Sequence, residues 1–458
     1  VTGALTSGNT TDDTTLVLSG TNESGSSMKV FNGSTELGAA TVSGTSWSYS
    51  ATVANGTTYQ FNVKETDLAG NTSDATSNFA VTGDTTAPTL AETTVVPSLT
   101  NDNSTQYTFS STEGGTISIG GSCSSDNNTA VADNMTVSFA ALADGTYSDC
   151  TITVTDSAGN TQIIEVNTFT IDTIAPTLAE VTRVSTPTND NTSSYTFSSN
   201  EAGTITYGVC SGSPDNASND NNTITFDALA DGTYDNCTIS VTDNASNTSA
   251  NLPVYSFTID TVKPVLAERT AVTTPTNDTT PAYSFSSTEA GTNSYGGSCG
   301  SSSTSATSSG LDNVTIILTQ TDNSTALSEA QYANCSITIT DSAGNTSTPL
   351  NVNTFVVDTT APCLSQVTAV TTPTNDTTPG YAFSSNEAGT ISYGGSSCSP
   401  GGTSASSGTN SISFGTLSEG SYSCTITVTD SAGNASNALS VNTFMVDTTA
   451  PDINGSIG

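Results

Sequence analysis

The sequence contains no histidine and only five basic residues among 458. Without an imidazole, the chain cannot assemble a Ser/His/Asp or Cys/His catalytic centre. Forty-two acidic residues give a formal net charge of -37. Such a chain repels phosphate backbones and anionic membrane surfaces, because both are bound through clustered Lys and Arg. The sequence therefore predicts a protein that is not an enzyme and that binds no nucleic acid.

Long apolar runs and helical patterns are also missing. No stretch of about 18 or more apolar residues occurs, so we expect no membrane insertion in this fragment. No window keeps the helical period over three turns. The chain starts at Val1 without an initiator methionine or a signal-like stretch, and it stops at DINGSIG, just after a repeat boundary. We therefore expect it to be a piece of a longer protein.

One pentapeptide recurs and divides the chain into similar segments. Its copies read DTTAP, DTIAP, DTVKP, DTTAP and DTTAP, and they begin at Asp84, Asp172, Asp260, Asp358 and Asp447. The spacing from proline to proline is 88, 88, 98 and 89 residues, which suits a small domain and is too long for a solenoid repeat. The predicted domains are residues 1–83 (without cysteine), 84–171, 172–259, 260–357 (with longer loops) and 358–446, followed by the start of a further repeat at 447–458.

Between the boundaries, short segments rich in β-branched and aromatic residues alternate with Gly, Asn and Ser turns. In the second predicted domain, Tyr107 and Phe109 share one face of a segment, as do Val137 and Phe139, while the other face carries Ser and Thr. One buried and one solvated face are typical of strands in an all-β sandwich. The only tryptophan, Trp47, is most simply a core residue.

The loop sequences TDLAGN, TDSAGN, TDNASN, TDSAGN and TDSAGN, each followed by an aromatic-bearing strand and a boundary pentapeptide, resemble the bacterial immunoglobulin-like repeats of large secreted surface adhesins. The resemblance covers essentially the whole chain. It implies an all-β, tandem array of immunoglobulin-like Greek-key β-sandwiches, arranged as extended beads on a string. At roughly 40 Å per sandwich, five domains would span about 200 Å.

Eight of the nine cysteines form four couples, one in each predicted domain after residue 83. In an immunoglobulin-like topology the end of strand C and the start of strand F meet at one pole, so we expect one disulfide per domain. Reduced structural thiols are the alternative, whereas zinc would require histidine or CxxC-like clusters. Disulfides indicate an oxidising, extracellular location. The couples are Cys123 with Cys150, Cys210 with Cys237, Cys299 with Cys335, and Cys398 with Cys424.

The ninth cysteine, Cys363, stands where the other boundaries carry Thr or Val after the proline. It could cross-link to another chain or pair with a residue outside this fragment. We expect a free or buried thiol.

Almost half of the acidic residues occupy fixed positions of the repeat, which solubility alone would not require. They lie in the boundary pentapeptide, in the TDSAGN-type loop, in the TND-type turn and in the loop before strand F. Clustered carboxylates repel unless a cation lies among them, and oxygen ligands without histidine favour Ca²⁺. The candidate ligands are Asp84, Asp156, Asp102, Asp144, Asp172, Asp243, Asp190, Asp231, Asp260, Asp341, Asp278, Asp358, Asp430, Asp376 and Asp447.

Strand direction predicts which of these acids meet. Around Asp172, we expect Asp102 and Asp144 to approach from the preceding domain and Asp243 from the following one. The hypothesis is a Ca²⁺ ion at or near each domain junction. The alternative is that these residues are turn and capping aspartates, which hydrogen-bond their own backbone.

These features predict a non-enzymatic, extracellular structural or adhesive stalk that spaces or attaches a cell surface. Two alternatives stay open. One is a protomer of an extracellular filament or sheath that forms by self-association. The other is a glycan- or receptor-binding module. The expected partners are neighbouring copies of the chain or a host or cell-surface ligand.

Overall fold

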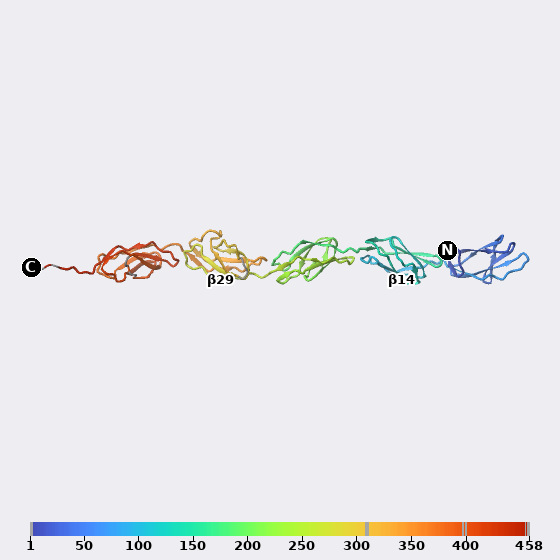
Figure 1. Ribbon diagram of the computed structural model, residues 1–458, viewed down its shortest axis with the longest axis horizontal. Coiled ribbons are helices and arrows are strands. Elements are labelled where there is room, and N and C mark those ends of the chain that lie inside the picture. Colours follow the sequence, from blue (N-terminus) through green and yellow to red (C-terminus); the bar gives the residue numbers. More distant parts are fainter. Residues whose placement is uncertain (1–2, 307–310, 396–397, 399–400, 454, 456–458) are drawn as a thin grey trace. The chain divides into compact units, whose positions relative to one another are not determined.

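Every regular element of the part of the chain that the structure describes is a β-strand (Figure 1). This computed structural model describes residues 3–306, 311–395, 398, 401–453 and 455. Among these residues, no helix is long and apolar enough to span a membrane. The all-β fold class predicted from the sequence is therefore confirmed.

The chain divides into two compact units. Unit 1 comprises residues 1–183, 194–227 and 236–255, and unit 2 comprises residues 184–193, 228–235 and 256–458. The finer division at the boundary pentapeptides stays a prediction. Below, repeats 1 to 5 denote residues 1–83, 84–171, 172–259, 260–357 and 358–446.

Repeat 1 contains two sheets, with strand orders β1-β8-β7-β3-β4 and β2-β6-β5. All pairs in them are antiparallel except β1 with β8. The core lies between the two sheets and includes Val30, Trp47, Phe61 and Val81. The strands are β1 (Asn9–Thr11), β2 (Thr15–Thr21), β3 (Ser27–Asn32), β4 (Thr35–Ala39), β5 (Thr41–Ser43), β6 (Ser46–Thr52), β7 (Thr57–Thr66) and β8 (Phe79–Gly83).

Repeat 2 shows the arrangement on which the candidate site depends. One sheet has the order β14-β11-β9, a second has the order β13-β12-β16-β17, and β10-β18-β15 closes one end. In immunoglobulin terms β9, β11, β12 and β16 correspond to strands A, B, C and F. The strands are β9 (Leu90–Thr94), β10 (Leu99–Thr100), β11 (Gln106–Ser111), β12 (Gly115–Gly120), β13 (Thr129–Ala130), β14 (Asp133–Ser138), β15 (Gly145–Tyr147), β16 (Thr151–Asp156), β17 (Thr161–Glu165) and β18 (Phe169–Ile171).

Repeats 3 to 5 keep the pairing order of the two main sheets, with one further strand in the first sheet of repeat 3, and their third sheet has two strands. Repeat 3 contains β19 (Leu178–Thr182), β20 (Ser194–Ser199), β21 (Gly203–Tyr207), β22 (Gly212–Ser213), β23 (Asn216–Ala217), β24 (Asp220–Phe226), β25 (Gly232–Tyr234), β26 (Thr238–Asp243), β27 (Leu252–Pro253) and β28 (Phe257–Ile259). Repeat 4 contains β29 (Leu266–Thr270), β30 (Ala282–Ser287), β31 (Gly291–Gly296), β32 (Ser305–Ala306), β33 (Leu311–Ile317), β34 (Ala330–Tyr332), β35 (Ser336–Thr340), β36 (Leu350–Asn351) and β37 (Phe355–Val357). Repeat 5 contains β38 (Leu364–Thr368), β39 (Gly380–Ser385), β40 (Gly389–Gly394), β41 (Ser404–Ala405), β42 (Gly408–Ser413), β43 (Gly420–Tyr422), β44 (Thr425–Thr429), β45 (Leu439–Ser440) and β46 (Phe444–Val446).

A disulfide joins the cysteines of each predicted couple. In repeat 2, Gly120 at the end of β12 pairs with Thr151 at the start of β16, and this brings Cys123 and Cys150 together. Both cysteines belong to the buried core, beside Tyr107 and Phe109. The Cα–Cα distances are 5.4 Å for Cys123–Cys150, 5.3 Å for Cys210–Cys237, 5.2 Å for Cys299–Cys335 and 5.9 Å for Cys398–Cys424.

The ninth cysteine, Cys363, is a free thiol and is exposed rather than buried. It precedes β38 by one residue, and its backbone N–H donates to the side chain of Asn386 at 2.6 Å.

Replacing Cys210 and Cys237 together by alanine should lower the free energy of unfolding of repeat 3 by about 3 to 4 kcal/mol, because the cross-link spans 27 residues and restricts the unfolded chain. Hydrogen exchange in urea, followed by mass spectrometry, measures the stability of each repeat separately. Cys363→Ala is the control and should leave every repeat unchanged. Unchanged exchange in repeat 3 of the double variant would contradict the prediction.

Candidate metal centre

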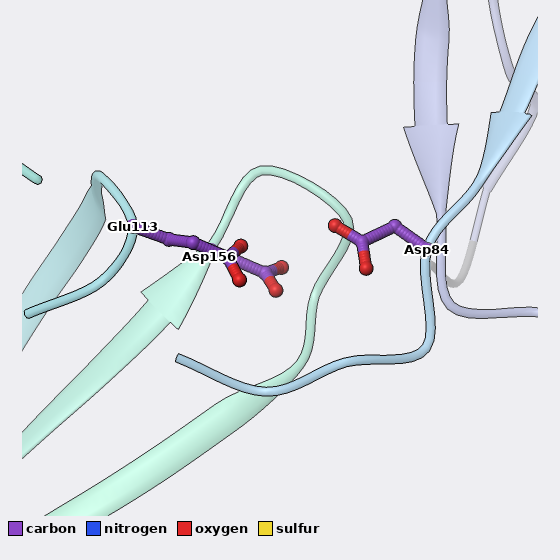
Figure 2. Close-up of side chains that lie close together, drawn as sticks. All are labelled: Asp84, Glu113 and Asp156. Atoms are coloured by element: carbon purple, nitrogen blue, oxygen red, sulfur yellow. The ribbon is translucent and has the colours of Figure 1, made fainter. Parts of the chain in front are cut away.

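Three carboxylates meet at the start of repeat 2. Asp84, Glu113 and Asp156 each offer an oxygen, and these atoms lie within 4.8 Å of one another. Figure 2 shows Asp84 pointing from the boundary segment toward Glu113 in a turn and Asp156 at the end of β16. Asp156 is buried, with 7% of its surface exposed, and the other two are half-buried. The same grouping recurs as Asp172 with Glu201 and Asp243, Asp260 with Glu289 and Asp341, and Asp358 with Glu387 and Asp430.

The loop that follows Asp156 fixes its carboxylate. Oδ1 accepts hydrogen bonds from the backbone N–H groups of Ala158, Gly159 and Asn160, at 2.8, 2.7 and 3.0 Å. Oδ2 accepts a hydrogen bond from the side-chain amide of Asn160 at 2.9 Å. Gly159 has φ +108°, a left-handed conformation that glycine adopts without a Cβ clash. The sequence TDSAGN therefore closes a turn that holds this carboxylate in one orientation.

A tight turn between β11 and β12 positions Glu113. Its N–H donates to the Ser111 hydroxyl at 3.3 Å, and that hydroxyl donates to the Glu113 carbonyl at 2.6 Å. Gly115 follows, and a Cβ at this position would lie 2.0 Å from the carbonyl oxygen of Thr155. Because glycine permits this approach, β12 begins directly beside the end of β16. Glu113 is thereby placed next to Asp156.

Asp84 is held from both sides of the boundary. Its N–H donates to the carbonyl of Thr11 in repeat 1 at 2.8 Å. Its own carbonyl accepts a hydrogen bond from the side-chain amide of Asn160 in repeat 2 at 2.9 Å. One residue therefore links backbone and side-chain groups of two successive repeats. The same two bonds recur for Asp172 with Thr100 and Asn247, Asp260 with Thr188 and Asn345, and Asp358 with Thr276 and Asn434.

Burial, and then repulsion within the cluster, raise the pKa of its glutamate. Burial raises the pKa of Glu113 above its usual range, and the negative charges of Asp84 and Asp156 raise it further. The same causes, in the same order, raise the pKa of Glu201, Glu289 and Glu387. Three carboxylates at this distance are stable together only if a proton or a cation offsets their charge. The four clusters could therefore each hold a metal ion.

The aspartates of the TND-type turns lie outside these clusters. Asp102 accepts hydrogen bonds from the N–H and the hydroxyl of Ser104, both at 3.0 Å. This carboxylate closes its own turn, as the alternative interpretation of the sequence predicted. The turn does reach the boundary, since the N–H of Asp172 donates to the carbonyl of Thr100 at 3.0 Å, but the carboxylate of Asp102 is not grouped with that of Asp172 as the metal hypothesis expected. The remaining members of this set bind their own turns in the same way, Asp190 with Thr192, Asp278 with Thr280 and Asp376 with Thr378.

The acids before strand F also lie outside the clusters. Asp144 accepts hydrogen bonds from the N–H and the hydroxyl of Thr173, at 3.0 and 2.9 Å. Asp231 binds Thr261 in the same way, at 2.9 Å for both bonds. Since each threonine directly follows a boundary aspartate, these acids hold the boundary segment and are not grouped with the metal-binding candidates. Asp144 therefore approaches the boundary, as expected, but not the carboxylate of Asp172.

Asp447, the last boundary aspartate, belongs to no carboxylate cluster of the described residues. Its N–H donates to the carbonyl of Thr374 at 2.9 Å, as at the other boundaries. Repeat 1 carries the corresponding loop aspartate, Asp67, which accepts hydrogen bonds from the N–H and side-chain amide of Asn71 at 2.8 and 2.9 Å. This loop is thus built like the others without a described cluster beside it.

Sequence reasoning missed the four glutamates as members of the site. A signal was present, because Glu followed two residues later by Gly recurs in repeats 2 to 5, as EGG or EAG. However, the sequence around a glutamate in a turn does not show whether its carboxylate binds a metal or is simply exposed to solvent. Only the pairing of β12 with β16 places Glu113 beside Asp156.

The strand order and the boundary clusters define a chain of small immunoglobulin-like β-domains in tandem. A family model described as bacterial Ig-like domain matches residues 1–85 and 365–448. These two matches agree with the resemblance seen in the sequence. No curated protein sequence matches the chain.

Solved structures with similar parts include a mixed-linkage glucan utilization protein of Bacteroides ovatus, SGBP-B, in complex with a mixed-linkage heptasaccharide. It is 13% identical, with 70% of this chain and 89% of that chain covered and a TM-score of 0.15. Escherichia coli alpha-2-macroglobulin activated by porcine elastase is 8% identical, with 94% and 52% covered and a TM-score of 0.18. Salmonella alpha-2-macroglobulin reacted with methylamine is 9% identical, with 96% and 39% covered and a TM-score of 0.17. At these TM-scores the similarities support no inference about function.

Glu113→Gln should stabilise metal-free repeat 2 near neutral pH, because it removes a negative charge that burial and two neighbouring carboxylates both disfavour. The pKa of Glu113 is raised in the folded chain, so its ionised form opposes folding. That penalty appears as the pH rises through the raised pKa and is absent below about pH 4, where the carboxyl is protonated in both states. Urea unfolding in EDTA, followed by hydrogen exchange in repeat 2, measures the gain.

The matched control is Glu165→Gln, an exposed glutamate on β17 of the same repeat, which should change the stability at neither pH. An equal effect of Glu113→Gln at acidic and neutral pH would show that the negative charge of Glu113 is not its cause.

Proposed function

We propose that the chain is a non-enzymatic, extracellular stalk whose successive immunoglobulin-like repeats are fixed to one another by Ca²⁺ at the boundary aspartates. In this proposal the repeats space or attach a cell surface, and the metal makes the boundaries rigid. A host or cell-surface ligand would then be bound elsewhere in the assembled protein.

This proposal rests on the two hydrogen bonds of each boundary aspartate, one to the preceding repeat and one to the following repeat. The N–H of Asp84 is bonded to repeat 1 and its carbonyl to repeat 2. Its carboxylate faces Glu113 and Asp156, which belong to repeat 2. A cation bound by these three groups would fasten the boundary segment to repeat 2 at a point where the backbone is already held by repeat 1. The equivalent hydrogen bonds at Asp172, Asp260 and Asp358 would let a cation fasten the boundary segment in the same way at the next three boundaries.

The donor set favours Ca²⁺ over other metals. It consists of carboxylate oxygens, and the chain has no histidine, so soft or imidazole-preferring metals are poorly matched. Ca²⁺ accepts about six to eight oxygen ligands in irregular geometry, which suits three buried or half-buried carboxylates together with water. Mg²⁺ requires a near-octahedral shell and gives up its water reluctantly.

Two further observations support the structural role. The same cluster stands at four boundaries, whereas a catalytic site is rarely copied at every joint of a protein. The four disulfides suit an oxidising compartment and supplement cores that are small for each repeat. Both features fit a protein that resists unfolding outside the cell.

Isothermal titration of the full chain with Ca²⁺ should give a stoichiometry close to four, one ion for each cluster. Asp156→Asn should lower the stoichiometry to about three, because it removes one charged ligand while its remaining oxygen can still accept the N–H bonds of the loop. Asp102→Asn is the matched control and should retain four ions, since Asp102 binds only its own turn. No heat of binding at about millimolar Ca²⁺ would refute the metal site.

Ca²⁺ should also stiffen the chain. Small-angle X-ray scattering in EDTA should show a broader distribution of maximum dimensions than in Ca²⁺, because unneutralised clusters leave the boundary segments free to bend. Asp156→Asn should reduce the change and Asp102→Asn should not. Identical scattering with and without Ca²⁺, in a chain that binds the ion calorimetrically, would contradict the stalk while leaving the metal site intact.

A further inference from the structure

Repeat 4 carries a polar residue at a core position that is apolar in the other three disulfide-bonded repeats. Asn293 on β31 pairs with Ile339 on β35, and its side chain is buried, with 6% of the residue exposed. The same register position holds a buried isoleucine in repeats 2, 3 and 5, as Ile117, Ile205 and Ile391. Because an apolar side chain suits this position in three repeats, the core of repeat 4 does not by itself require an amide here.

One half of this amide is hydrogen-bonded and the other half is not. Nδ2 of Asn293 donates to the carbonyl of Ser303 at 3.2 Å, and the Tyr295 hydroxyl donates to the same carbonyl. Oδ1 of Asn293 is buried and accepts no hydrogen bond from the described residues. A buried acceptor without a donor is unfavourable, since burial has removed its hydrogen bonds to water. A ligand that offers a donor at this point would therefore bind more tightly than one that does not.

The connection between β33 and β34 is longer than its counterpart in repeat 2. Residues 318–329 separate these two strands, whereas residues 139–144 separate β14 from β15. The added residues form a turn with its own hydrogen bonds. The N–H of Gln320 donates to the carbonyl of Thr325 at 2.8 Å, and the N–H of Asn323 donates to the carbonyl of Gln320 at 2.9 Å. This turn is therefore a defined structure that holds its side chains in place.

The turn docks on the residues that follow Cys299. The N–H of Ser301 donates to Oδ1 of Asn323 at 3.2 Å. Gly300 and Thr319 exchange two backbone hydrogen bonds of 2.8 Å. A Cβ at Gly300 would lie 2.2 Å from Asn323 Oδ1, so glycine permits this approach. The residues that follow the first cysteine in the other three couples are Ser124, Ser211 and Ser399.

The turn, β31 and the segment after Cys299 enclose a cavity of about 410 Å³. Sites for small molecules usually measure roughly 300 to 1,000 Å³. Amides, hydroxyls and one aromatic ring line the cavity, and no charged side chain of the described residues is among the lining groups. The lining includes Asn293, Tyr295, Ser301, Thr321 and Asn323.

An uncharged lining of this kind selects a ligand by its hydrogen-bonding groups. A chain with a formal net charge of -37 repels anions, and a cation would meet no carboxylate in the lining. Hydroxyl groups both donate and accept, so a polyhydroxylated ligand can bond to amides, to Ser and Thr hydroxyls and to Asn293 Oδ1 at the same time. The ring of Tyr295 offers an apolar surface to the C–H groups of such a ligand.

We infer that repeat 4 binds a neutral saccharide in this cavity. A sugar hydroxyl donates to Asn293 Oδ1, directly or through one water molecule, and the exposed Thr321 and Asn323 hold the sugar at the rim. The cavity lies toward the Cys299 end of β31, whereas Glu289 of the boundary cluster precedes the other end. The site therefore adds recognition of a ligand to one repeat of the proposed stalk, and it does not depend on the metal sites.

A glycan array that presents both neutral and anionic glycans, probed with the labelled full chain, tests this inference. The chain should bind at least one neutral glycan, and isothermal titration with that glycan should give one site per chain in EDTA as well as in Ca²⁺. Binding to anionic glycans only, or to no glycan, would overturn the inference. Loss of the calorimetric Ca²⁺ signal with intact glycan binding would refute the metal proposal only.

Asn293→Ile gives repeat 4 the residue that repeats 2, 3 and 5 carry, so the fold of the repeat should be preserved. Because the change removes the amide, it should weaken binding of the glycan by about tenfold or more without lowering the thermal stability. Thr321→Val removes one hydroxyl at nearly constant volume and should weaken binding by roughly three- to tenfold. The matched control is Thr315→Val, a change at an exposed threonine of β33 outside the lining, which should bind as wild type.

Hydrogen exchange then locates the site. The glycan should slow exchange in β31 and in the turn at residues 320–326 of the wild-type chain, and it should not do so in Asn293→Ile. Unchanged affinity in both Asn293→Ile and Thr321→Val, or protection confined to another repeat, would place the glycan elsewhere and overturn the inference. A cavity that holds only ordered water in a crystal of the chain soaked with the glycan would overturn it as well.

Discussion

The whole arrangement depends on the two hydrogen bonds that hold each boundary aspartate. Through its N–H it belongs to the repeat before it, and through its carbonyl to the repeat after it. Its carboxylate is thereby placed within 4.8 Å of two others. The backbone hydrogen bonds therefore hold three carboxylates close enough to repel one another, and a bound cation would attract all three. This constraint explains why the acidic residues recur at the same positions of successive repeats.

Between the boundaries, repeats 2 to 5 stabilise their small cores in the same way. Buried Tyr and Phe residues on strand B pack against a disulfide that joins strands C and F, as Tyr107 and Phe109 do with Cys123 and Cys150. Strand A then covers the remaining edge. Repeat 1 contains no cysteine, and its core is built around Val30, Trp47, Phe61 and Val81 instead.

Several features followed from local chemistry and could be predicted. Alternating apolar residues predicted strands, and the recurrent couples of cysteines predicted the disulfides. The loop aspartate Asp156 and the boundary aspartate Asp84 were predicted as neighbours because the ends of antiparallel strands meet at one pole. Asp102 and Asp144 share the residue type and the regular spacing of these ligands. They bind Ser104 and Thr173 instead, since an aspartate near an unsatisfied N–H group takes it as a partner.

The sequence by itself determined the all-β class, the period of the repeat, the pairing of the cysteines and the kinds of residue available for chemistry, because all of these depend on composition and on spacing along the chain. The tertiary structure alone decided which acids meet. Glu113 joins Asp84 and Asp156 only because a glycine allows β12 to begin against the end of β16. It also decided which strands lie side by side, as β9 does with β11 in repeat 2, since the covering of an edge depends on contacts between strands that the sequence pattern does not specify.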